Sequence, residues 1–114
     1  CYGHVSSQTL LVLTTCPGPE DANRLGRLLV EQRLAACVNA VNNVTSTYRW
    51  QGELQQDQET LLVIKTTEAR FAALELAIRQ HSSYELPEVV AVAVHAGSPP
   101  YLAWLRESVA EFKD

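Results

Sequence analysis

Residues 36–67 read ACVNAVNNVTSTYRWQGELQQDQETLLVIKTT. Two segments rich in β-branched and aromatic residues flank Gln51-Gly52, where the glycine suits a tight turn, so we expect a long β-hairpin. The pair Asn42-Asn43 interrupts the first segment with side chains that tolerate positive φ, which predicts a bulge or a sharp bend. The return segment is apolar without alternation at 61–64, which indicates a central strand buried on both faces.

Helical and strand patterns flank this hairpin on both sides. An apolar strand is expected at 9–15, and an amphipathic helix at about 19–34. After the hairpin we expect a second helix at 68–80, a strand at 89–94 and a C-terminal helix over 101–112. The predicted order is therefore β-α-β-β-α-β-α.

This order is typical of an α+β protein, the ferredoxin-like βαββαβ sandwich, here with an extended hairpin and an added C-terminal helix. Its four strands take the order 4-1-3-2, and both crossover helices cover one face. We expect the first strand to run parallel to the third and antiparallel to the fourth. That arrangement would gather Cys16, Lys65–Thr67 and Leu86–Glu88 at one end of the sheet.

Length and composition define the class of protein. A chain of 114 residues and 12.6 kDa fits a single domain, which we place at 9–112, with 1–8 as a disordered or processed remnant. With 46% hydrophobic and 19% charged residues, the chain has enough apolar surface for a core. A formal net charge of -4 argues against nucleic acid and anionic membranes as partners.

The cysteines indicate a reducing compartment. Cys1, Cys16 and Cys37 are an odd number with no CxxC spacing, which argues against a disulfide framework or a four-cysteine zinc site. Cytoplasmic localisation follows as the expectation. For Cys37, among small apolar neighbours, a buried structural role is favoured over a reactive thiol.

The predicted fold leaves apolar surface without a cover. Both crossover helices lie on one sheet face, yet the strands at 61–64 and 89–94 are apolar on both sides. The hairpin is also far longer than the roughly six residues that a strand commonly has. We therefore expect oligomerisation through the open sheet face and the hairpin.

Three residues are candidate metal ligands. Cys16, His81 and Glu88 offer a thiolate, an imidazole and a carboxylate, a donor set that suits copper or zinc. For His81, the alternative is a structural role at the C-terminal end of the second helix.

Three others are candidates for a ligand cleft. Tyr48 and Trp50 offer rings for stacking, and Lys65 offers a cation for an anionic ligand. The alternatives are a subunit contact for the two aromatic residues and an ion pair with Glu59 or Glu88 for the lysine. Tyr101 and Trp104, spaced i and i+3, are expected in the core or an interface.

Signatures of catalysis do not occur in the sequence. It contains no GxSxG, HExxH or P-loop motif, nor GxGxxG in its structural context. We expect no catalytic residue, no enzymatic reaction and no obligatory cofactor. A hydrolase would need a nucleophile with a base beside it, and the sequence alone identifies no such pair.

Six short motifs, in order and spacing, resemble the CutA divalent-cation-tolerance family over nearly all of residues 9–106. They are Thr14-Thr15-Cys16-Pro17, Leu34-Ala35-Ala36-Cys37-Val38-Asn39, Tyr48-Arg49-Trp50-Gln51-Gly52-Glu53, Lys65-Thr66-Thr67, His81 with Tyr84, Pro87 and Glu88, and Tyr101-Leu102-Ala103-Trp104-Leu105.

The resemblance implies a homotrimer similar in architecture to the PII signalling proteins, with hairpins paired between subunits. It also implies a role in copper and divalent-metal tolerance, as in bacterial members, while mammalian members are associated with acetylcholinesterase anchoring. In the bacterial copper-binding pattern, a cysteine falls about where Thr14 stands, and a second histidine where Ser82 stands. We expect non-enzymatic metal binding; the alternative is PII-like signalling through a small anionic ligand in an intersubunit cleft.

Overall fold

The computed structural model describes residues 8–110 of the 114. Within that range the elements are β1 (Thr9–Cys16), α1 (Pro19–Glu31), β2 (Cys37–Trp50), β3 (Glu53–Thr67), α2 (Glu68–His81), β4 (Val90–Ala93) and α3 (Pro99–Val109). The predicted order of strands and helices is confirmed. Except for Gln8, the expected N-terminal remnant lies outside the described residues.

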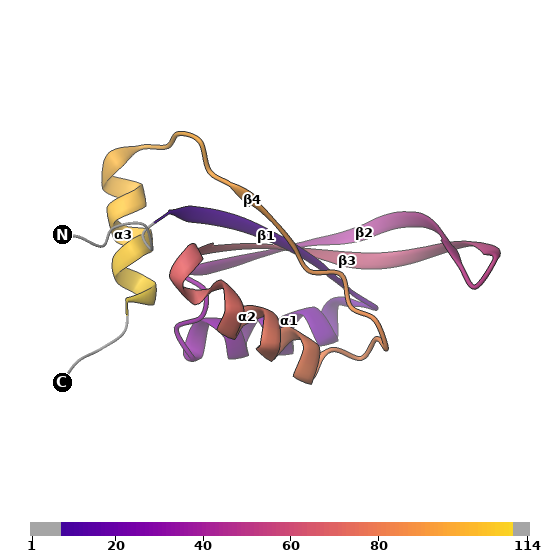
Figure 1. The fold of residues 1–114 in the computed structure, drawn as a ribbon. Helices are drawn as coiled ribbons and strands as arrows, with labels where there is room; N and C mark the ends of the chain where they lie inside the picture. Colours follow the sequence, from indigo (N-terminus) through magenta and orange to yellow (C-terminus); the bar gives the residue numbers. More distant parts are fainter. Residues whose placement is uncertain (1–7, 111–114) are drawn as a thin grey trace.

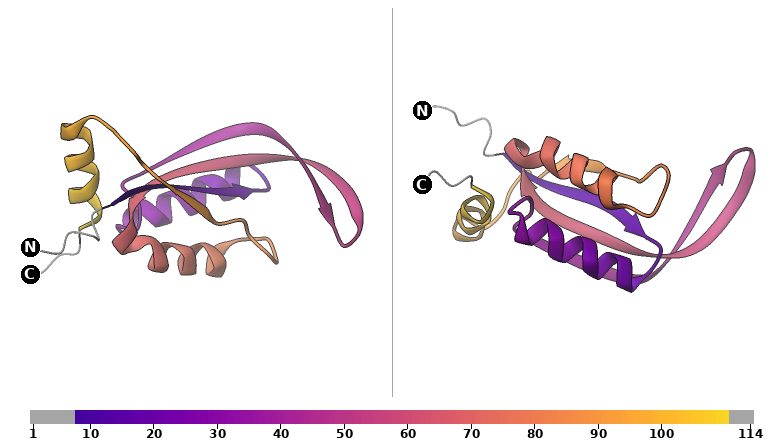
Figure 2. Two further views of the ribbon diagram at one scale, coloured as in Figure 1. Left: turned by 45° about the horizontal axis from the view of Figure 1, so that its top comes forward. Right: turned by 90° about the horizontal axis from the view of Figure 1, so that it is seen from below.

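The described strands form one sheet in the order β2-β3-β1-β4, the predicted order seen from the other edge. Every neighbouring pair is antiparallel. The helices α1 and α2 lie side by side on one face, while α3 packs at the end opposite the hairpin tip (Figures 1 and 2). This is the ferredoxin-like α+β architecture with an extended β2-β3 hairpin.

The direction of one strand differs from the prediction. β1 runs antiparallel to β3, so that Cys16 pairs with Thr60 and Thr9 pairs with Thr67. The predicted parallel pair was wrong because a crossover makes the first and second strands parallel, and the hairpin then reverses the third. Lys65–Thr67 consequently lies at the opposite end of the sheet from Cys16.

The core lies between the sheet and the two crossover helices. Val12, Leu62 and Ile64 contribute fully buried side chains from the sheet, and Leu29 and Ile78 contribute them from the helices. Alternate positions of β1 and β3 are buried, as the twofold repeat of a strand requires when helices cover one face.

Helix α1 ends earlier than its sequence pattern predicts, at Glu31 rather than near residue 34. Arg33 takes a left-handed conformation with φ 59°, and the Leu34 N–H donates to the Leu29 carbonyl at 2.9 Å. This is the geometry of a helix terminated by a left-handed residue, formed here without glycine. It turns the chain into β2 next to the core.

The other side of the sheet is an open face, formed by Leu11, Leu13, Leu61, Val63, Val90 and Val92. Neither crossover helix covers it, and α3 packs at the end of the sheet that holds Lys65 (Figure 2). Val90 is 50% exposed and Val92 56%, while Leu61 and Val63 are only partly buried. The predicted burial of residues 61–64 on both faces of the sheet is therefore wrong for a single subunit. The exposed apolar surface that the sequence predicts for the open face is present.

The hairpin has the predicted bulge and turn. The register shifts between Val41 and Val44, with Asn43 at φ 61°. At the tip, Gln51 and Gly52 have φ values of 53° and 83°, as in the two-residue turns that match the twist of a hairpin.

Gly52→Ala is expected to lower the free energy of unfolding by about 1 kcal/mol, because a Cβ is strained at a φ of +83° even where space is open. Urea denaturation at fixed protein concentration measures this change. Gly52→Asn is the matched control, since it adds a Cβ at the same open position but asparagine adopts positive φ more readily than alanine. Equal losses in the two variants would contradict the prediction.

Candidate functional site

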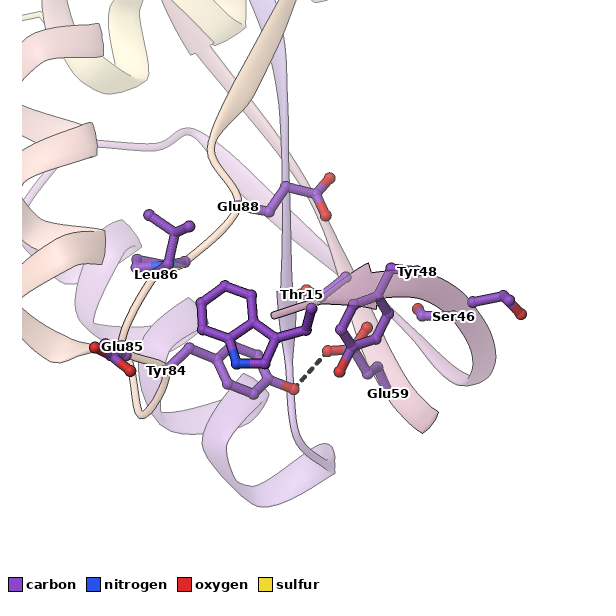
Figure 3. Close-up of a pocket in the computed structure, with 11 residues that line it drawn as sticks. Thr15, Ser46, Tyr48, Glu59, Tyr84, Glu85, Leu86 and Glu88 are labelled. Carbon is purple, nitrogen blue, oxygen red and sulfur yellow. Dashed lines mark hydrogen bonds between the residues drawn. The ribbon is translucent and has the colours of Figure 1, made fainter. Parts of the chain in front are cut away.

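A pocket of about 810 Å³ lies where the open face meets the curved hairpin. Three segments form it: the end of β1, the outer part of the hairpin and the loop between α2 and β4 (Figure 3). Its lining residues are Thr15, Ser46, Thr47, Tyr48, Trp50, Glu59, Tyr84, Glu85, Leu86, Pro87 and Glu88.

The bulge determines which hairpin side chains face this pocket. Val41 pairs with Leu61 of the open face, but after the bulge Val44 pairs with Glu59. Paired residues point to the same side of a sheet, so the even-numbered residues of β2 share the side of Glu59 beyond the bulge. Tyr48 and Trp50 belong to that set.

The loop after α2 supplies the opposite wall. Val90 pairs with Leu13, and the chain that leads into β4 runs past the end of β1. This path brings Glu88 next to Thr15 at the pocket, with Glu85 and Leu86 farther along the same loop (Figure 3).

Two tyrosine hydroxyls in the pocket are held by carboxylates. The Tyr84 hydroxyl donates to Glu59 Oε2 at 2.5 Å, and the Tyr48 hydroxyl donates to Asp57 Oδ2 at 2.5 Å. Burial, followed by the bond to Glu59, raises the pKa of Tyr84, while the bond to Asp57 is the main cause of the raised pKa of Tyr48. Both phenols therefore remain neutral donors at physiological pH.

The pocket is acidic. Glu59, Glu85 and Glu88 line it, and none of its eleven lining residues is basic. Partial burial raises the pKa of Glu88, and the negative charge of Glu59 adds to this rise. A positive charge between the carboxylates would relieve their repulsion.

Glu88→Gln is expected to raise the melting temperature by about 1–2 °C at pH 8 and to leave it unchanged at pH 4. The raised pKa of the folded-state carboxyl means that its stabilising contribution is present below its unfolded pKa of 4.5 and is lost as the pH rises through the folded value. Thermal unfolding at both pH values tests this. Glu107→Gln, a surface substitution on α3, is the matched control and should leave the melting temperature close to that of the wild type. A lower melting temperature of Glu88→Gln at pH 8 would contradict the prediction.

Of the predicted ligand-cleft residues, Tyr48 and Trp50 line the pocket and Lys65 does not. Lys65 pairs with Leu11 and Cys37 near the other end of the sheet. The expected approach to Glu59 or Glu88 is therefore wrong, because it depended on the mistaken strand direction.

Lys65 instead faces the aromatic residues of α3. Its Nζ lies 5.8 Å from the centre of the Tyr101 ring. The centre of that ring lies 5.4 Å from the centre of the Trp104 ring. Tyr101 is 42% exposed and Trp104 45%, so neither residue is in the core of the subunit. Their predicted role in an interface remains a prediction.

The predicted metal ligands do not form one cluster. Within residues 8–110, no group of three or more histidine, cysteine, aspartate or glutamate side chains is placed to hold a metal ion. Glu88 lines the pocket, while His81 is exposed at the last position of α2. The predicted gathering of His81, Cys16 and Glu88 is wrong for a single subunit, since α2 ends at the surface and the Cys16 side chain points into the core.

The two described cysteines differ in their surroundings. Cys16 is 4% exposed, and burial, with a further contribution from Asp21, raises the pKa of its thiol to about 11. Such a thiol is a poor ligand until a metal displaces its proton. Cys37 is only partly buried, not buried as expected, and its Sγ donates to Asn39 Oδ1 at 3.7 Å.

Sequence reasoning did not place Glu59 and Tyr84 in the cleft. Glu59 continues the alternation of Leu61 and Val63 and is the first charged residue beyond them toward the hairpin tip, where the open face becomes polar. Tyr84 lies in a loop 25 residues away along the chain, so no local pattern indicated their hydrogen bond.

The structure has close counterparts among solved proteins. The divalent cation tolerance protein CutA1 of Thermus thermophilus superposes with a TM-score of 0.87 at 46% identity, over 90% of this chain and 99% of that one. CutA1 from Oryza sativa gives a TM-score of 0.90 at 37% identity, over 96% of this chain and all of that one.

Sequence relatives agree. The divalent-cation tolerance protein CutA of Thermus thermophilus is 48% identical over 98 residues, which are 86% of this chain and 95% of that protein. Protein CutA of Mus musculus is 40% identical over 105 residues, 92% of this chain but 59% of the mouse protein. The family model described as CutA1 divalent ion tolerance protein matches residues 10–108. The chain therefore belongs to the CutA1 divalent ion tolerance family.

Proposed function

We propose that this protein is a homotrimer that binds divalent metal ions, copper among them, and thereby contributes to metal tolerance without catalysing a reaction. Membership of the CutA1 family supports the tolerance role. The observation that carries metal binding is the acidic pocket, where Glu59 and Glu88 repel each other and a cation would stabilise both.

Glu88 is the first of the proposed metal ligands. Its neighbour in the pocket, Glu59, is the second carboxylate, and oxygen ligands of this kind bind divalent cations. His81 and Cys16 stay in the proposal as separate ligands. The exposed imidazole of His81 is free to bind at the surface, while Cys16 would have to lose a tightly held proton.

Isothermal titration with Cu(II) and with Zn(II) tests the proposal. Wild type should bind, and Glu88→Gln should weaken binding by about tenfold, the effect of removing a charged ligand. Glu107→Gln on α3 is the matched control and should leave the isotherm unchanged. His81→Ala, titrated in parallel, assigns the imidazole; identical isotherms for wild type, Glu88→Gln and His81→Ala would overturn the proposed ligands.

The homotrimer is supported by the open face. Val90 and Val92 expose half or more of their surface on the sheet face that neither crossover helix covers, and such a patch favours association. Sedimentation equilibrium should give a mass of about three times the 12.6 kDa subunit. A monomer mass would contradict this part of the proposal.

A PII-like role with an anionic ligand receives less support from the pocket. Its charged lining residues are all glutamates, and Lys65, the proposed anion-binding residue, lies elsewhere. Anions would be repelled by this arrangement.

The proposed location is the cytoplasm, where Cys16 and Cys37 would stay reduced. No helix among residues 8–110 is long and apolar enough to cross a membrane. Relatives differ in their described compartments, since a rice protein is named chloroplastic and an Archaeoglobus fulgidus structure is described as periplasmic.

A further inference from the structure

We propose that the pocket binds a small organic cation, a protonated alkylamine, between the rings of Trp50, Tyr48 and Tyr84 and the carboxylates of Glu59 and Glu88. This ligand class goes beyond metal binding, although both ligands would use the same carboxylates. The proposal rests on what lines the pocket, how its polar groups are already bonded and how large it is.

Aromatic rings supply the first part of the recognition. In the single subunit, Trp50 is 39% exposed and Tyr48 41%, and both line the pocket together with Tyr84. The faces of aromatic rings attract cations, and indole attracts them most strongly. Rings beside carboxylates are a common arrangement for binding ammonium groups.

The hydrogen bonds of the two phenols favour a cation over an anion. Tyr48 and Tyr84 already donate their hydroxyl hydrogens to Asp57 and Glu59. An anionic ligand would need those donors and would meet the carboxylates instead. A cationic ligand needs only the ring faces and the remaining carboxylate oxygens, which these bonds leave available.

The carboxylates supply the second part of the recognition. Glu59 on the hairpin and Glu88 on the loop both line the pocket, and the Tyr84 hydroxyl donates to Glu59 (Figure 3). An ammonium group offers three donors and no acceptor, which suits a pocket whose charged lining residues are all carboxylates.

The size of the pocket favours an organic ligand over a metal ion. At about 810 Å³, it is within the range of small-molecule sites and far larger than one ion requires. Leu86 and Pro87 add apolar surface to the wall, which suits the methylene groups of an alkylamine. The described residues also lack a compact group of three or more metal-binding side chains.

Isothermal titration with putrescine, which carries two ammonium groups on four methylenes, tests the inference on the full chain at low ionic strength. Putrescine should bind, and 1,4-butanediol, its uncharged analogue, should not. Glu88→Gln should weaken putrescine binding by about tenfold. Trp50→Leu should weaken it by about three- to fivefold, the range of a cation–π contact at an exposed site.

The chain offers a matched control for each substitution. Glu107→Gln removes the same charge from α3, and Trp104→Leu removes a similarly exposed indole that does not line the pocket. Both controls should bind putrescine as the wild type does. Circular dichroism and sedimentation confirm that each variant is folded and has the wild-type mass.

Parallel copper titrations distinguish the two proposals. Trp50→Leu should lose putrescine affinity but keep copper affinity, because a metal ion needs the carboxylates and not the ring. Copper binding without putrescine binding would overturn this inference and leave the proposed function in place. Equal binding of putrescine and butanediol, or unchanged putrescine binding in both Glu88→Gln and Trp50→Leu, would also overturn it.

Discussion

Leu62→Ala is expected to lower the free energy of unfolding by about 3 kcal/mol, the largest stability change among the substitutions considered. Leu62 has no exposed surface and lies in the middle of β3, paired with Thr14 on one side and Ala40 on the other. Strands flank it and both crossover helices cover it, so its neighbours can move little to fill the cavity. Urea denaturation at fixed protein concentration measures the loss.

Leu76→Ala is the matched control for this substitution. Leu76 lies on α2 and is 45% exposed, so its truncation should change the free energy of unfolding by less than about 0.5 kcal/mol. Because an oligomer gains stability with concentration, both variants must be compared at the same subunit concentration. Similar losses of unfolding free energy in Leu62→Ala and Leu76→Ala would show that the main core does not lie on the helix-covered face of the sheet.

Val90→Glu is expected to convert the assembly into 12.6 kDa subunits in sedimentation equilibrium. Val90 is half exposed on the open face, on the edge strand β4 opposite Leu13, and the proposed trimer would bury it. An unpaired carboxylate there would cost several kcal/mol on assembly but would remain solvated in a free subunit. The variant should therefore stay folded while it loses its partners.

Val30→Glu provides the comparison for Val90→Glu. Val30 is 41% exposed on α1, on the helical side of the sheet, and the same charge there should leave the assembly intact. Circular dichroism separates dissociation from unfolding. If Val90→Glu keeps the wild-type mass and stability, the open face is not the surface that joins the subunits.

The sequence predicted the fold through local patterns. Gln51-Gly52 and Asn42-Asn43 indicated the turn and the bulge, and the order of the elements then limited the topology to few choices. Helix ends were less accurate, because Arg33 adopts a left-handed conformation that its residue type does not favour.

The candidate site was predicted only in part. Tyr48, Trp50 and Glu88 were identified by residue type, and all three line the pocket. Lys65 was misplaced because its position depended on the direction of β3, which no local pattern determines. The contact between Tyr84 and Glu59 joins a loop to a strand, and such long-range contacts follow from the packed structure rather than from any sequence motif.

The bulge in β2 follows from a mismatch in chain length. Between the pair Val41–Leu61 and the pair Trp50–Glu53 there are nine residue steps on β2 and eight on β3, so one residue must be left unpaired. If the two strands paired regularly outward from Val41 instead, Thr45 and Arg49 would take the side now held by Tyr48 and Trp50. A difference of one residue thus selects a wall of two aromatic side chains over one that carries Arg49.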